Sequence, residues 1–124
     1  MRIIAVKRLN VLAAGASGAA LALFPEATSR WIGTVPPDVL RAIGIVTLLY
    51  GAHVLASSLR TREVRGELLW FAACDAGWVV VTAAAILIGA ISTAWGAVAA
   101  IALAAVVATF GVFYRREARR TAHA

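Results

Sequence analysis

Two ionisable side chains, His53 and Asp75, lie inside long apolar runs of this 124-residue sequence. A charge within hydrocarbon costs roughly 2.5–3.5 kcal/mol on insertion scales, so residues of this kind are candidates for binding a ligand or a proton. His53 precedes the end of its run by six residues, and Asp75 follows the start of the next run by seven. At a helical rise of about 1.5 Å per residue, both lie roughly 10 Å from the same end of neighbouring helices, and we expect them to lie close together.

Three further residues are candidates for the same site. Tyr50 lies one turn before His53, Trp78 lies near the middle of its run, and Thr82 shares the helical face of Asp75. Two interpretations stay open: these groups bind a ligand or a proton, or a hydrogen bond from one of them to Asp75 simply joins two helices. In either case we expect the carboxyl group to face the interior of the bundle, near His53 or Tyr50.

Motifs of the common enzyme classes are absent from the sequence. It has no Walker loop, nucleophile elbow, HExxH pair or Gly-rich dinucleotide turn, which favours a non-enzymatic role without deciding the question. The single cysteine, Cys74, excludes an intrachain disulfide and a Cys-rich zinc site, and we expect neither a metal nor a cofactor. Small multidrug transporters have four spans at this length with an acid in the first, and the first apolar run here has none.

The elements that must position these residues are four apolar runs, which also account for the composition. The chain is 62% hydrophobic with a mean hydropathy of +0.87, whereas soluble domains have about 45–50% apolar residues. The runs are apolar on all sides, as is typical of helices surrounded by lipid. The sequence therefore predicts an all-α membrane protein, a four-transmembrane-helix bundle that forms a single membrane domain over residues 1–124. The expected spans are residues 9–24, 39–59, 68–88 and 95–114.

The first run, residues 9–24, is short for a span. We expect Lys7 and Arg8 to compensate by extending their side chains to the membrane surface. A cleaved signal peptide is the alternative for this run, because basic residues precede it and small residues lie near its end.

The connections between the runs carry helix-terminating and capping residues. Residues 25–37 predict a short interfacial helix between the first two spans, beginning at Pro25 and ending near Gly33. Asp38 is expected to cap the second span, and Ser92 or Thr93 the fourth. Trp31 and Trp95 are placed to mark one membrane interface, and Trp70 and Tyr114 the other.

The distribution of basic residues predicts the orientation of the helices. Ten of the 12 Lys and Arg residues fall at the N-terminus, in the second connection or in residues 115–124. Because short basic segments stay in the cytoplasm, we expect cytoplasmic N- and C-termini and a basic cytoplasmic tail over residues 115–124. The Ala-, Gly- and Arg-rich composition suggests the cytoplasmic membrane of a bacterium. This orientation explains the net charge of +6, so the lipid bilayer is the expected partner and nucleic acid is not.

Small residues recur at helical spacing in three of the runs and are candidates for close helix packing. Such residues let helix backbones approach one another within a membrane. They suit packing within one bundle, and they also suit the face of a homo-oligomer or a contact with a partner membrane protein. The two halves of the chain run in the same direction, which leaves an internal duplication open. The residues are Ala14, Gly18 and Ala22, then Gly44 and Gly51, then Gly96, Ala100, Ala104 and Ala108.

Residues 21–51 contain the strings LALFPEATSRWIG and LRAIGIVTLLYG. A first helix ending in Phe-Pro, a surface segment ending in Trp-Ile-Gly, and a Gly-containing second helix that opens with Arg resemble the small DoxX-like bacterial membrane proteins. The resemblance covers about a quarter of the chain and implies a four-helix fold. Most such proteins have no assigned activity, and some are membrane partners of quinone-linked oxidoreductases. No catalytic motif is available to carry over.

Three hypotheses for the function remain after these observations. The first is a non-enzymatic subunit or scaffold of a membrane complex, since no enzyme motif is present and the basic rim suits a partner or anionic headgroups. The second is a small-molecule or proton-linked carrier built on Asp75 and His53, which would act as an oligomer. The third is a redox subunit that binds a quinone-like molecule or a lipid near Trp78 and His53.

Overall fold

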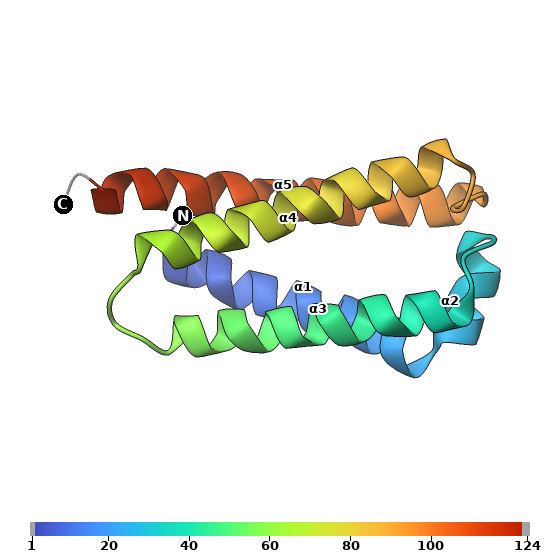
Figure 1. The fold of residues 1–124 in the computed structure, drawn as a ribbon, viewed down its shortest axis with the longest axis horizontal. Coiled ribbons are helices and arrows are strands. Elements are labelled where there is room, and N and C mark those ends of the chain that lie inside the picture. The colour runs from blue at the N-terminus through green and yellow to red at the C-terminus, as the bar shows by residue number, and fades with distance from the viewer. Residues whose placement is uncertain (1, 123–124) are drawn as a thin grey trace.

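Five helices follow one another along the chain in the computed structural model, which describes residues 2–122 (Figure 1). They are α1 (Ile3–Leu23), α2 (Pro25–Ile32), α3 (Pro37–Ser58), α4 (Arg65–Leu87) and α5 (Ala94–Ala122). The expected all-helical fold is confirmed: within the described residues the only β-type pairing is an isolated bridge between Gly33 and Ile91. Four of the helices, all except α2, are long and apolar enough to cross a membrane.

Helices α1 and α5 extend furthest beyond the apolar runs expected from the sequence. Helix α1 begins at Ile3, six residues before the first run, and α5 continues through the expected tail to Ala122. The last residues of the tail, 123–124, lie outside the described part of the chain. Hydropathy marks where apolar residues stop, but Arg, Lys and Glu are good helix formers and continue the backbone hydrogen bonds past that point.

The four long helices form two antiparallel pairs. Helix α1 packs mainly on α3, and α4 packs mainly on α5, while a smaller contact between α1 and α5 joins the pairs (Figure 1). The backbones of α3 and α4 make at most a marginal contact. Long side chains therefore have to bridge the space between α3 and α4.

The α1–α3 pair is held by small residues that allow close backbone approach. A Cβ atom added at Gly44 would lie 2.5 Å from the backbone nitrogen of Ala22, and one added at Gly51 would lie 3.2 Å from the Cβ of Ala14. Gly18 faces the carbonyl oxygen of Gly44 across the same interface. The small residues of the first two runs thus pack against each other within the chain.

The small residues of α5 serve a different contact. Gly96 is buried, and a Cβ there would lie 2.8 Å from the Cα of Ile32, the last residue of α2. Ala100 and Ala104 are half-buried, and Ala108 is exposed. The ladder on α5 is therefore buried at its α2 end and becomes exposed along the helix.

The end of the bundle near α2 is fixed by hydrogen bonds. Thr93 caps α5, because its Oγ1 accepts a hydrogen bond from the backbone N–H of Gly96 at 3.0 Å, as expected. Thr93 Oγ1 also donates to the carbonyl oxygen of Trp31 at 2.6 Å, which ties the start of α5 to α2. The expectation for Asp38 is wrong: α3 begins at Pro37 after an N-cap at Pro36, so Asp38 lies inside the first turn and makes no capping bond.

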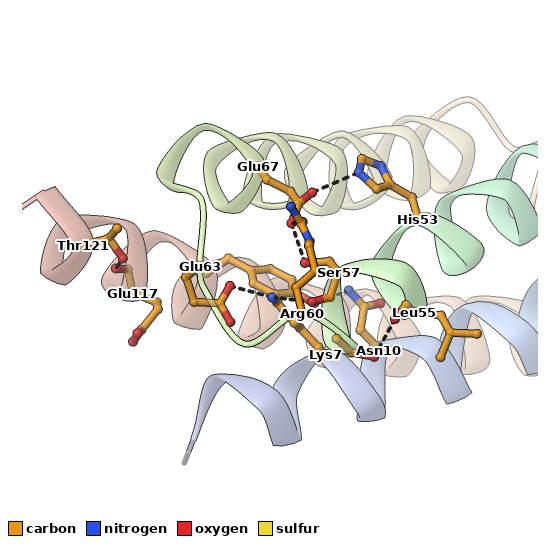
Figure 2. A network of polar contacts seen from close by, with 12 residues as sticks. Lys7, Asn10, His53, Leu55, Ser57, Arg60, Glu63, Glu67, Glu117 and Thr121 are labelled. Carbon is orange, nitrogen blue, oxygen red and sulfur yellow. Dashed lines mark hydrogen bonds and ion pairs between the residues drawn. The ribbon is translucent and has the colours of Figure 1, made fainter.

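The opposite end, which we call the Arg-rich end, holds the start of α1, the connection from α3 to α4, and the end of α5 (Figure 1). Lys7 does not extend to the surface as expected. It is fully buried, and its Nζ lies 2.5 Å from Glu63 Oε2 and donates to the carbonyl oxygen of Ser57 at 3.4 Å (Figure 2). The connection from α3 to α4 places the Glu63 carboxylate against the Lys7 ammonium group, and Lys7 is therefore paired inside the protein instead of being exposed.

Candidate functional site

A cavity of about 480 Å³ lies between the two helix pairs. All four long helices contribute to its walls, which are mainly apolar. Cavities of about 300–1,000 Å³ with apolar walls and a few polar groups are typical of small-molecule sites. The lining residues are Asn10, Ala13, Ala14 and Ser17 of α1, Val46, Thr47, Leu49, Tyr50 and His53 of α3, Trp70, Cys74, Asp75 and Trp78 of α4, and Leu103 and Val107 of α5.

Asp75 is the centre of the polar groups in this cavity. It is 2% exposed, and its Oδ1 accepts a hydrogen bond from the Tyr50 hydroxyl at 2.9 Å. The Tyr50 oxygen in turn accepts from Asn10 Nδ2 at 3.2 Å, and the same amide nitrogen donates to the Tyr114 hydroxyl at 2.8 Å. These four residues, which we call the polar cluster, join all four long helices.

The local packing explains why Asn10 and Tyr50 meet. Asn10 precedes Ala14 by one helical turn, so both face α3. Gly51, next to Tyr50 in sequence, allows Ala14 to approach α3 closely. The same small-residue contact that holds the α1–α3 pair therefore brings the Asn10 amide within hydrogen-bonding distance of Tyr50.

Phe71 fixes the positions of the aromatic rings around the polar cluster. It is fully buried, and its ring lies 5.8 Å from Tyr50, 5.0 Å from His53 and 5.4 Å from Tyr114, measured between ring centroids. The first two contacts are edge-to-face, an arrangement that aromatic pairs prefer. Three rings, two from α3 and one from α5, thus pack on one side chain of α4, which limits their freedom to rotate.

Two buried polar atoms near the cavity have no hydrogen-bond partner within the described part of the chain. They are Oδ2 of Asp75 and the indole Nε1 of Trp78. Asp75 and Trp78 lie three residues apart on α4, so both side chains project from the same face of the helix, and both line the cavity. An unpartnered buried polar group costs about 1–3 kcal/mol, which makes these atoms the natural contacts for a bound molecule.

His53 does not bind Asp75, contrary to one of the two contacts expected for it. Its Nε2 lies 3.3 Å from Glu67 Oε2 (Figure 2). Glu67 precedes Asp75 by eight residues, about two helical turns, on the side of the Arg-rich end. Glu67 also accepts hydrogen bonds from Ser57 and Arg60. His53 therefore occupies the edge of the cavity with a side chain that is 46% exposed, while Tyr50 takes the position beside Asp75.

Thr82, the third candidate on α4, is buried but does not line the cavity. The polar residues that α4 contributes to the cavity wall therefore end at Trp78.

Two residues of the polar cluster were not selected from the sequence. Asn10 is a polar amide at the start of the first apolar run, and that position was a usable signal. Tyr114 was expected at a membrane interface, but it is fully buried and bonded to Asn10.

The cavity opens sideways, between α3 and α4. The lining residues that are largely exposed belong to these two helices: Val46 is 66%, Leu49 67% and Trp70 56% exposed. This opening, which we call the portal, lies where the two helix backbones are apart. Any molecule that enters here passes apolar and aromatic side chains before it reaches Asp75.

The lining of the cavity includes no Lys or Arg. Asp75 and His53 are the carboxylate and imidazole of the lining, and Lys7, the one nearby lysine, is paired with Glu63 outside the cavity. Among residues 2–122 no group of three potential metal ligands is close enough to hold a metal ion. The site is thus suited to hydrogen bonding and apolar contact with an organic molecule.

Comparisons with protein-family models, curated proteins and solved structures found no match to this chain.

Proposed function

We propose that this chain is an integral membrane protein that binds a lipid-soluble small molecule in the cavity between its two helix pairs. The four long apolar helices would span the bilayer, with the Arg-rich end in the cytoplasm as the positive-inside rule predicts. The portal between α3 and α4 would then face the hydrocarbon region. Ligand would enter laterally from the bilayer, without passing through water.

The observation that carries this proposal is the buried carboxyl group in the wall of the cavity. Asp75 has one oxygen bonded to Tyr50 and the other unpartnered. A carboxyl group that only joined two helices would be expected to use both oxygens in protein contacts, because an unused one weakens the joint. The free oxygen and the apolar walls around it together support binding, which was the alternative to the scaffold hypothesis.

Photocrosslinking tests the proposal. The protein is placed in phosphatidylcholine nanodiscs with an aliphatic diazirine probe, irradiated, and the labelled residues are identified by mass spectrometry. We expect adducts to concentrate on cavity-lining residues of α3 and α4, above the level on exposed positions elsewhere.

A blocking variant and a matched control make the test specific. Leu49→Trp places a large side chain in the portal and should remove the concentrated labelling. Val80→Trp introduces the same side chain at a position of α4 that is 66% exposed and outside the cavity lining, so it should leave the pattern unchanged. Even labelling over all exposed faces in the wild type, or equal effects of the two variants, would contradict the proposal.

A role as a subunit of a membrane complex is a second proposal, favoured by the end of α5. Arg115, Arg116 and Arg119 are exposed, and no acidic residue of the described chain lies within ion-pairing distance of them. With Val112 they border a shallow depression of about 200 Å³. Purification in a mild detergent should then recover a partner protein that is lost in a variant with these three residues changed to Gln. Recovery of the chain alone at every step would count against this role.

A further inference from the structure

The two unpartnered atoms of the cavity restrict the chemistry of its ligand. Asp75 is 2% exposed and offers Oδ2, and Trp78 offers a buried indole N–H that can only donate. We infer that the ligand is an uncharged lipophilic molecule whose polar head is a hydroxyl group. This inference rests on the proposed function, since it names the class of molecule that the cavity binds.

A hydroxyl group satisfies both atoms at once. Its hydrogen is donated to Asp75 Oδ2, and its oxygen lone pairs accept from Trp78 Nε1. The match also survives protonation of Asp75, because the hydroxyl oxygen has a second lone pair for an Oδ2–H donor. The remainder of the molecule lies against the apolar walls and extends toward the portal, where Leu49 and Trp70 are exposed.

Other head groups satisfy the site less completely. A cationic amine pairs with Asp75 but has no acceptor for the indole N–H, and a buried ion pair repays its desolvation only when further hydrogen bonds support it. Asp75 Oδ1 accepts from Tyr50, and Oδ2 has no partner among the described residues. An anion meets a cavity whose lining has no Lys or Arg, and the one lining histidine, His53, contacts Glu67. A plain hydrocarbon leaves Asp75 Oδ2 and Trp78 Nε1 without a hydrogen-bond partner, so the desolvation penalty of both atoms remains.

The single cysteine of the chain provides the assay. Cys74 lines the cavity next to Asp75, and it is the only cysteine in the sequence. The rate of its alkylation by a membrane-permeant maleimide therefore reports occupancy of the cavity. Wild-type protein in phosphatidylcholine nanodiscs is compared at equal mole fractions of dodecanol, dodecane, dodecyltrimethylammonium and dodecanoate. We expect dodecanol to protect Cys74 at a mole fraction at least tenfold below that needed for the other three.

Two variants locate the head group. Trp78→Phe removes the N–H donor and keeps an aromatic ring, and it should raise the mole fraction of dodecanol needed for protection about tenfold. Its effect on the other three probes should be small, because none of them uses that donor together with Asp75. Thr82→Val is the matched control: Thr82 is buried on the same helix outside the cavity lining, and its replacement should change none of the protection curves.

The outcomes separate this inference from the proposed function. Protection by dodecane equal to that by dodecanol would leave a lipophilic cavity and overturn the hydroxyl head. Stronger protection by dodecyltrimethylammonium would show that Asp75 selects a cation, which also overturns it. Failure of all four probes to protect Cys74 would overturn both the inference and the proposed function. These comparisons use the wild-type chain, so they hold even if Trp78→Phe does not fold.

Discussion

Gly44 lies where α3 crosses α1 most closely, and alanine at this position perturbs the interface in a calculable way. The added Cβ would lie 2.5 Å from the backbone nitrogen of Ala22, whereas ordinary contact begins at 3.4 Å, so the helices must separate by about 0.9 Å. A gap of that size forfeits a quarter to a half of the dispersion energy between facing atoms. Overpacking of this kind costs about 1–3 kcal/mol, and we expect a loss in that range.

Gly15 provides the control on the same helix pair. A Cβ added there meets nothing within 4 Å, and replacing a helical glycine by alanine stabilises a helix by up to about 1 kcal/mol. The two variants are compared by titrating mixed micelles with dodecyl sulfate and following tryptophan fluorescence. Gly44→Ala should unfold at a lower dodecyl sulfate fraction than wild type, and Gly15→Ala at an equal or higher one. If Gly44→Ala were as stable as Gly15→Ala, the close contact between α1 and α3 would not exist as described.

The remaining predictions concern the cap of α5, the carboxyl group and the orientation. Thr93→Ala should lose about 1 kcal/mol in the same unfolding titration, and Ser92→Ala, whose hydroxyl makes no capping bond, should not. Asp75→Asn should keep the fold, whereas Asp75→Leu should lose about 0.6–1.7 kcal/mol, the range for hydrogen bonds between membrane helices; equal stability of the two would refute the Tyr50 contact. In a Cys74→Ala background, an impermeant maleimide should label Thr34→Cys in intact cells and Thr61→Cys only after permeabilisation, and the reverse pattern would refute the orientation.

The helices were predictable because their signal is long and repeated. Each apolar run is sustained over many residues, so a few unusual positions do not obscure it. The ends were less predictable, since Lys7 and the arginines of α5 lie beyond the apolar runs but still belong to the helices. The burial of Lys7 depends on Glu63, which is 56 positions away in sequence, and no local pattern contains that pairing.

Part of the site was predictable, because residues at the same height on two adjacent helices can contact each other. Matching Asp75 with α3 at equal depth identified Tyr50 and His53 as the two possible contacts, which differ by one turn. The choice between them depended on Glu67, because this carboxylate accepts the His53 contact and leaves Asp75 to Tyr50. The cavity itself was not predictable, since it follows from the separation of the two helix pairs and not from any single residue.

The division into two helix pairs has a consequence for how the protein is made on the ribosome. Each pair consists of consecutive long helices, so in the proposed membrane topology α1 and α3 can associate through their glycines before α4 and α5 are made. The hydrogen bond from Asn10 to Tyr114 joins positions 104 residues apart and has to wait for the last helix. Until α5 is in place, Asn10 lacks its hydrogen bond to Tyr114, and Asp75 lacks its contact with Gly111. The cavity, whose walls include residues of α5, can therefore be completed only after the last helix has been made.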